Sequence, residues 1–181
     1  MKNCALLLID VQKGFRDPSW GKRNNPKAED NMKLLLEAFR SKRLPIIHIQ
    51  HLSCEKDSPL RPGQEGIEFM EGFEPMAGEK VFQKSVNSAF IGTDLESCLR
   101  KEALQNLVIV GLTTDHCIST TVRMASNLGF TVYLVADATA TFERKSLSLC
   151  YSPELVHEVN LASLHREFAT VTTAENILMN R

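Results

Sequence analysis

The chain has 181 residues, with 21 Lys and Arg against 22 Asp and Glu and a hydrophobic content of 43%. A chain of this length and composition can bury a full core, so we expect one domain over residues 1–181. Its balanced charge and lack of a basic run exclude the patterns of nucleic-acid and membrane-surface proteins, which leaves a small molecule as the expected partner.

Six short apolar runs follow one another along the chain. Their apolar residues are nearly continuous, which is typical of strands buried on both faces of a parallel sheet. The first run is too short for a membrane span or the core of a signal peptide, so we expect a cytoplasmic protein. The predicted strands are residues 4–10, 44–50, 80–84, 107–111, 131–137 and 168–173.

Stretches with helical spacing of apolar residues separate these runs. Strands that alternate with helices predict an α/β fold, a doubly wound six-stranded parallel sheet with helices on both faces in a three-layer, Rossmann-like arrangement. The predicted helices are residues 27–42, 94–104, 117–128, a stretch that starts at Pro153, and about 174–179. Their expected core-facing residues include Leu34, Leu35, Ala38 and Phe39 in the first helix and Leu155, Val159, Ala162 and Leu164 in the fourth. Residues 52–79 show no clear period and are predicted to form a long ordered loop.

Three reactive side chains follow predicted strands. Asp10 ends the first strand, Lys84 ends the third, and Cys117 follows the fourth across a short turn. Ligands of open parallel sheets gather at the carboxyl ends of the strands, so we expect these side chains to meet there. Each one alone could equally be a solvated strand end or a helix cap.

The chemistry of these residue types is coherent. A helix start and a nearby lysine both lower the pKa of a cysteine thiol, so Cys117 is a candidate nucleophile activated by Lys84. Asp10 could accept the thiol proton and return it to a leaving amine. Backbone N–H groups of the turn "LTTD" could hold an oxyanion.

The segments "LLLIDVQKGF", "VFQKSVNSAFIGTDL" and "LVIVGLTTDHCISTTVRMASNLGFTVYLVADATATF" resemble the isochorismatase-like cysteine hydrolase family over most of the chain. The resemblance implies a catalytic triad of Asp10, Lys84 and Cys117. It also implies a cis peptide between Leu112 and Thr113 that turns the amides of Thr113 and Cys117 toward the substrate carbonyl as an oxyanion hole.

Two features of the sequence refine the implied activity. Nicotinamidases of this family bind a metal through an Asp-x-His motif after the second strand, but this chain has "HIQHLS", which offers no carboxylate. We therefore expect no metal and no cofactor. Because Cys117 is present, we expect C–N cleavage through a thioester instead of ether cleavage. The "NSAF" of residues 87–90 is similar to that of carbamoyl-amide hydrolases and favours a small amide or ureido substrate.

Other residues are candidates for the pocket. Phe15, Trp20 and Phe142 lie in loops after strand ends, where they either line the substrate pocket or extend the core. His51 is a further candidate for substrate binding, whereas His48 lies inside an apolar run and is interpreted as a packed core residue.

Two alternatives to a metal-independent cysteine amidohydrolase stay open. One is a nicotinamidase that uses a metal. The other is a non-catalytic binding or redox-sensing protein in which Cys117 is an oxidisable thiol. In each case a homo-oligomer, dimer or tetramer, is expected, with a neighbouring subunit beside the pocket.

Overall fold

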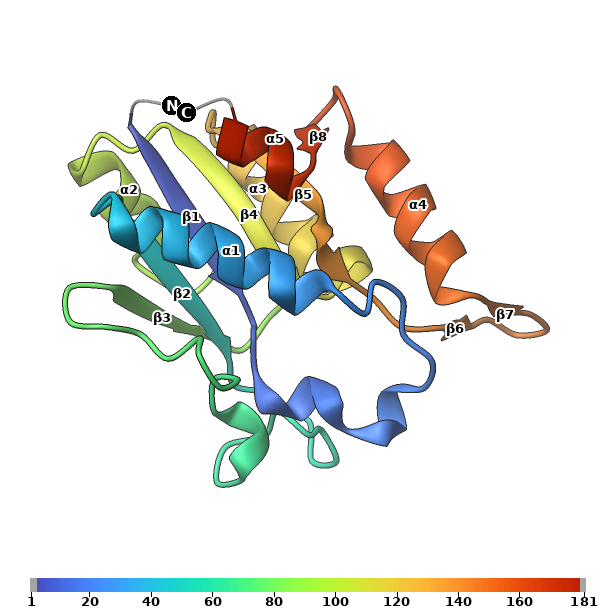
Figure 1. Cartoon of the computed structure of the whole chain (residues 1–181). Helices are drawn as coiled ribbons and strands as arrows, with labels where there is room; N and C mark the ends of the chain where they lie inside the picture. The colour runs from blue at the N-terminus through green and yellow to red at the C-terminus, as the bar shows by residue number, and fades with distance from the viewer. Residues whose placement is uncertain (1–2, 180–181) are drawn as a thin grey trace.

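The computed structural model describes residues 3–179, and a parallel sheet of six strands forms its centre (Figure 1). The strand order β3-β2-β1-β4-β5-β8 confirms the predicted doubly wound sheet. Each predicted run overlaps one of the strands; β2 ends one residue later than expected, β4 is one residue longer at each end, and β5 continues three residues further. The strands are β1 (Cys4–Ile9), β2 (Ile46–His51), β3 (Lys80–Lys84), β4 (Asn106–Leu112), β5 (Thr131–Ala140) and β8 (Thr170–Thr172).

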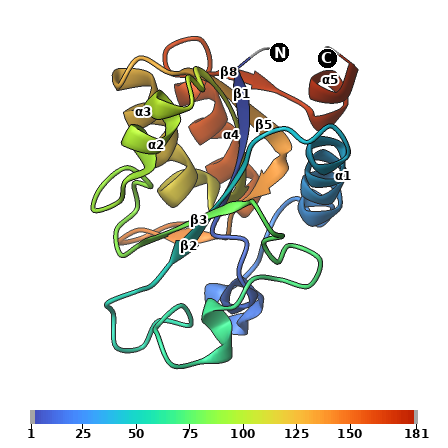
Figure 2. The ribbon, with the colours of Figure 1, turned by 90° about the vertical axis from the view of Figure 1, so that its left-hand side faces the viewer.

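Helices cover both faces of this sheet, as predicted. Figure 2 shows α1 and α5 on one side of the strands and α2, α3 and α4 on the other. The α-helices are α1 (Ala28–Ser41), α2 (Leu95–Lys101), α3 (Ser119–Asn127), α4 (Pro153–Leu164) and α5 (Ala174–Met179). Short 3-10 turns lie in the loops: η1 (Lys13–Arg16), η2 (Pro18–Trp20) and η3 (Glu65–Ile67). Within residues 3–179, no helix has the length and apolarity that a membrane crossing needs.

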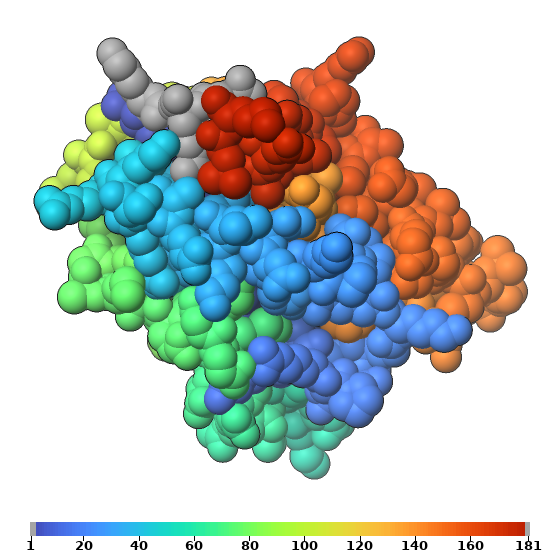
Figure 3. All heavy atoms as spheres, viewed as in Figure 1, coloured from blue at the N-terminus to red at the C-terminus, as the bar shows by residue number. Residues whose placement is uncertain are grey.

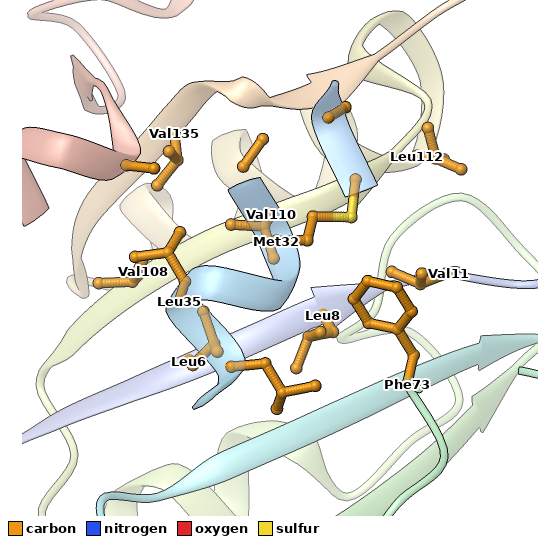
Figure 4. Packing of buried hydrophobic residues seen from close by; sticks show 14 of the residues in the cluster. Leu6, Leu8, Val11, Met32, Leu35, Phe73, Val108, Val110, Leu112 and Val135 are labelled. Carbon is orange, nitrogen blue, oxygen red and sulfur yellow. The ribbon is translucent and has the colours of Figure 1, made fainter. Parts of the chain in front are cut away.

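Two apolar cores lie between the sheet and its helix layers. On the α1 side, Met32 and Leu35 pack against Leu6, Leu8 and Val110 of the strands (Figure 4). The second core joins the other face of β1 and β4 to α2, α3 and α4. Because successive residues of a strand point to opposite faces, a continuous apolar run such as β1 is needed to fill both cores.

The helical spacing misplaced some core positions. Leu34 on α1 is 52% exposed, whereas Leu36, two residues later, is fully buried. In α4 the predicted stripe of Leu155, Val159 and Ala162 faces outward, and the buried residues are Pro153, His157, Leu161 and Leu164. Both helices have apolar residues on more than one face, so spacing alone could not identify the face that meets the sheet.

The long loop of residues 52–79 is ordered, as predicted. Its Met70 and Phe73 are buried in the core on the α1 side. A further connection was not predicted: an antiparallel hairpin of β6 (Arg144–Lys145) and β7 (Cys150–Tyr151) precedes α4. Each strand of this hairpin has only two residues, too few to produce a period.

Gly111 determines how β4 ends. Its φ is +124°, and a Cβ at this position would lie 2.0 Å from the carbonyl oxygen of Ile9. Only glycine allows the backbones of β1 and β4 to approach this closely at their carboxyl ends. The register between β4 and β5 also shifts between Ile109 and Gly111. β4 ends one residue later, at Leu112, and the turn that leads to Cys117 follows directly.

Candidate active site

Three neighbouring strands end at one place and bring three polar side chains together. His51, the last residue of β2, is paired in register with Lys84, the last residue of β3. Asp10 follows β1 directly, and its N–H donates to the carbonyl of Ile49 at 2.9 Å. From β1 the strand order continues to β2 and β3 on one side and to β4, β5 and β8 on the other. Asp10 therefore lies at the topological switch point, where ligands of such sheets bind.

Cys117 reaches this point from β4. The peptide between Leu112 and Thr113 is cis, as the family resemblance implied. A π-helical turn, η4 (Thr114–Ile118), follows and leads into α3. Cys117 therefore lies inside a π-turn and not at the start of an α-helix, which corrects the predicted helix start at residue 117. Such turns are frequent at functional sites because they change the direction of one side chain.

The turn also arranges backbone amides. The carbonyl of Thr113 accepts hydrogen bonds from the N–H groups of His116 at 3.2 Å and of Ile118 at 3.1 Å. The Cys117 amide lies between these two donors and takes no part in the pairing with Thr113. Thr113 is 2% exposed and Cys117 is 7% exposed, so a group held by their amides would be shielded from water.

Lys84 is the centre of the cluster. Its Nζ lies 2.7 Å from Oδ2 of Asp10, 2.9 Å from Nδ1 of His51 and 3.2 Å from Sγ of Cys117. An ammonium has three N–H donors, so these three neighbours use all of them. The side chains of Lys84 and Asp10 are both fully buried, and they form an ion pair.

The second oxygen of the Asp10 carboxylate is free. Oδ1 is buried and has no hydrogen-bond partner among the described residues. Leaving a buried carboxylate oxygen without a donor costs free energy, so such an atom calls for a functional explanation. Oδ1 can accept a proton. One oxygen of the Asp10 carboxylate lies within 4.8 Å of the Cys117 sulfur.

The pKa of Cys117 differs from the sequence-based expectation. Burial raises the pKa of the thiol, the negative charge of Asp10 raises it further, and together they outweigh the lowering effect of Lys84. Lys84 lowers the pKa, as expected from the sequence, but burial and Asp10 together hold it above its usual value, which favours the thiol form beside the ion pair.

His51 is also neutral. Burial lowers its pKa, and the positive charge of Lys84 lowers it further. Its Nδ1 therefore accepts an N–H from Lys84.

Asp10, His51 and Cys117 each offer an atom of a type that binds metals, within 4.8 Å of one another. The Lys84 ammonium, however, lies within hydrogen-bond distance of all three residues, so a cation already occupies the middle of this group.

Asn87 joins the site, although the family resemblance associated it only with substrate type. The Cys117 thiol donates to its Oδ1 at 3.6 Å.

Gln12 was missed in the sequence. It is fully buried, its Oε1 accepts from the N–H of His51 at 2.8 Å, and its Nε2 donates to the His51 carbonyl at 3.0 Å. The only signal for Gln12 in the sequence was its place two residues after Asp10, before the next helical stretch.

Two contacts behind η4 hold the turn that carries Cys117. The buried carboxylate of Asp115 accepts from Arg144 at 2.6 Å and also from the Thr141 hydroxyl. Although burial would raise the pKa of Asp115, these hydrogen bonds hold it below its usual value. On the other side, Oγ1 of Thr114 lies 2.8 Å from Nδ1 of His157, a buried residue of α4.

The predicted aromatic residues form a stack. The ring centroids of Phe15 and Trp20 are 5.1 Å apart, and those of Trp20 and Phe142 are 5.6 Å apart. Phe15 and Phe142 belong to the core on the α1 side, and the Trp20 indole donates to the Gly14 carbonyl at 2.8 Å. The core interpretation is therefore correct for this group, and contact with a substrate stays a prediction.

The remaining histidines lie outside the cluster. His48 is 1% exposed, and its Nε2 lies 2.7 Å from Oε2 of Glu79, which confirms it as a packed core residue. The His116 side chain is 52% exposed and lies against Asp115 at 3.4 Å.

Comparison with known proteins finds similar sequences and similar structures. The chain matches the isochorismatase domain over residues 4–176. It is 46% identical over 175 residues to the isochorismatase family protein YrdC of Bacillus subtilis (strain 168), covering 96% of this chain and 94% of that protein. The structure of a protein from Chromobacterium violaceum ATCC 12472, described as a hydrolase of the isochorismatase family, superposes with a TM-score of 0.93 at 45% identity. That match covers 97% of this chain and 91% of the other.

More distant relatives include two proteins named for reactions at amides. Nicotinamidase 3 of Arabidopsis thaliana is 26% identical over 192 residues, covering 97% of this chain and 87% of its own. The ureidoacrylate amidohydrolase RutB of Caulobacter segnis is 23% identical over 207 residues, covering 95% and 83%.

Proposed function

The chain belongs to the isochorismatase family of hydrolases, and from this premise we propose that it is a metal-independent cysteine amidohydrolase. Its substrate is a small amide or a ureido compound, and its intermediate is a thioester on Cys117. The observation that carries the proposal is the position of Lys84, whose ammonium contacts both Asp10 and the Cys117 sulfur while Oδ1 of Asp10 stays free.

In the first step, the Cys117 thiol loses its proton to the Asp10 carboxylate as sulfur attacks the carbonyl carbon of the substrate. The raised pKa of the thiol favours transfer of the proton together with the attack of sulfur. Lys84 stabilises the negative charge that develops on sulfur. The amides of Thr113 and Cys117 would stabilise the charge on the carbonyl oxygen.

The second step breaks the C–N bond. Asp10 returns the proton to the leaving nitrogen, which departs as ammonia or an amine, and the acyl group stays on Cys117 as a thioester. Water then attacks the thioester while Asp10 accepts one of its protons. That proton returns to sulfur as the C–S bond breaks, so the carboxylic or carbamic acid leaves and the resting thiol and ion pair are restored.

Two observations support a small amide or ureido substrate. Asn87 places an amide group beside the nucleophile, where it can bind the carbonyl or N–H groups of such a substrate. The relatives Nicotinamidase 3 and RutB are both named for amide hydrolysis. The stretch "HIQHLS" after the second strand favours the metal-independent form of the reaction, because it offers no carboxylate where nicotinamidases of the family have their metal-binding motif.

The test is a panel of primary amides, nicotinamide and ureido acids, assayed for released ammonia. We expect turnover of at least one member by the wild-type protein and none by Cys117→Ala with unchanged circular dichroism. Turnover of nicotinamide that disappears on chelation and returns with zinc or iron would support the metal-using alternative. A sulfenate on Cys117 after mild peroxide, with no ammonia from any substrate, would support the redox-sensing alternative.

A further inference from the structure

Helix α4 carries a buried histidine toward the turn that contains Cys117. The helix lies at the edge of the ribbon in Figure 1 and at the surface of the molecule in Figure 3. Its inner side packs against α3 and η4. His157 lies on this inner side and is only 4% exposed. Because so little water reaches the ring, its two nitrogens need partners within the protein.

Strand β5 offers a carbonyl as the partner of one ring nitrogen. Between Leu134 and Thr139, β5 advances five residues where β4 advances two, so its backbone bulges. Carbonyls inside a bulge lack a partner in the ladder of the sheet and can accept from side chains. His157 forms a hydrogen bond with the backbone of Ala136, in the middle of this bulge, and the bond raises the pKa of the ring, as donation to a carbonyl does.

Asn25 determines which ring nitrogen carries the proton. Its Nδ2 lies 3.4 Å from Nε2 of His157, but its two N–H groups donate to the carbonyls of Ala136 at 3.1 Å and Thr139 at 2.7 Å. Nε2 therefore has no hydrogen to accept, and it must be the donor to Ala136. Burial lowers the pKa of His157, so the ring is neutral at pH 7 and has one proton only.

The other nitrogen then acts on η4. Nδ1 of His157 has no proton, so it accepts a hydrogen bond from the Thr114 hydroxyl, whose oxygen lies 2.8 Å away. Thr114 is fully buried, directly follows Thr113 and precedes Cys117 by three residues. The Thr113 carbonyl is already held by two N–H groups of the same turn. The backbone of the turn fixes one side of this peptide, and His157 fixes the side chain beside it.

We propose that His157 is a positioning residue for the proposed cysteine hydrolase reaction. With its proton on Nε2, it accepts from the Thr114 hydroxyl and so fixes the turn that presents the Thr113 amide and the Cys117 sulfur. The effect on turnover rests on the proposed function, whereas the tautomer and the hold on the turn do not depend on a substrate. A displacement of about 1 Å at reacting atoms can cost about 10²-fold in rate, so a hold on this turn has a measurable effect.

Two substitutions of His157 separate positioning from packing. His157→Asn can place its Oδ1 close to the position of Nδ1 and keep an acceptor for Thr114. His157→Gln can place its Nε2 close to that of the ring and keep the donor to Ala136, but it offers Thr114 no acceptor. Both remove the ring, so their loss of packing is similar. We expect His157→Gln to lower kcat by about 10–100-fold with little change in KM, and His157→Asn to stay within about threefold of wild type.

The partner residue and a second histidine complete the set of variants. Thr114→Val keeps the shape of the side chain but removes the donor, so it should lower kcat as His157→Gln does. The two changes combined should cost no more than either alone. His48→Gln is the matched control, because His48 is also buried, at 1% exposed, and is bonded to Glu79. This control should lose stability and keep the wild-type kcat.

Two measurements need no substrate. The NMR chemical shifts of the ring nitrogens of His157, assigned by their absence in His157→Asn, should show the proton on Nε2. Labelling of Cys117 by iodoacetamide, followed by peptide mass mapping, should be faster in His157→Gln than in wild type, because a loosened turn exposes the buried sulfur. It should keep the wild-type rate in His157→Asn.

Three results would overturn the proposal: a proton on Nδ1, equal effects of the two His157 variants on kcat or on labelling, or a loss of kcat in His48→Gln as large as in His157→Gln. If the wild-type protein turns over no amide of the panel, the proposed function is contradicted. The tautomer and the labelling rates then decide alone whether His157 holds the turn.

Discussion

The buried ion pair of Asp10 and Lys84 allows catalysis and stability to be tested together. Asp10→Asn keeps the shape of the side chain but removes the proposed proton acceptor and leaves the Lys84 ammonium buried without its counter-ion. Lys84→Met removes the ammonium and leaves the Asp10 carboxylate without its donor. Both side chains are 0% exposed, so water cannot replace the lost partner.

The expected magnitudes follow from this burial. Removal of one partner of a buried pair costs about 3–5 kcal/mol of the free energy of unfolding, and removal of a general base costs about 10²–10⁴-fold in rate. In the double variant no unpaired charge is left. The double variant should therefore lose much less free energy of unfolding than the sum of the two single losses. Its activity should stay as low as that of either single variant, because the two groups serve one mechanism.

The assay combines urea denaturation of the wild type, both single variants and the double variant with turnover of a substrate found in the amide panel. Glu96→Gln is the control, because it breaks the exposed pair of Glu96 and Arg100, whose side chains are 40% and 51% exposed, and should cost under about 1 kcal/mol. Additive stability losses in the double variant, or turnover by Asp10→Asn within tenfold of wild type, would refute this account of the pair.

Three further predictions follow from the site and its surroundings. Burial lowers the pKa values of His48, His51 and His157 in the folded state, so the unfolded chain binds protons at these residues at a higher pH than the folded chain does. The free energy of unfolding, measured by urea denaturation, should therefore be level above about pH 6.5 and fall below it. A rise on acidification would contradict this. Turnover should survive dialysis against EDTA with metal loss checked by elemental analysis, because "HIQHLS" offers no carboxylate ligand for a metal; loss of activity that zinc or iron restores would show the reverse. Iodoacetamide at pH 7 should label the exposed Cys54 and Cys150 before Cys117, whose thiol is buried with a raised pKa; peptide mass mapping that finds Cys117 labelled first would contradict the neutral resting thiol.

The sequence predicted the sheet well because the relevant signal is local. A strand buried on both faces must be apolar at nearly every position, as β1 and β4 are, and this pattern differs from the spacing of an amphipathic helix. The meeting of Asp10, Lys84 and Cys117 could also be predicted, because parallel strands end at one edge of a sheet. The cis peptide before Thr113 was available only through the family resemblance.

Other features depend on contacts between distant segments, which no local pattern encodes. The pKa of Cys117 depends on how deeply the sulfur is buried, and burial at the site results from packing between segments that are far apart in the chain. Gln12 and His157 act through hydrogen bonds across the fold, to His51 and Thr114 respectively. The inner face of α4 was misjudged because both of its faces are apolar, and only the tertiary structure distinguishes them.

The central claim is that Cys117 carries the acyl group of an amide substrate, and the most direct measurement is the mass of the Cys117 peptide during turnover. The protein would be mixed with excess of an amide from the panel, quenched in acid within the first turnovers and digested. The account predicts a peptide heavier by the acyl group of the substrate, lost on treatment with hydroxylamine and absent from Cys117→Ala. Ammonia released at the wild-type rate by Cys117→Ala, or an acyl group on another residue, would contradict it.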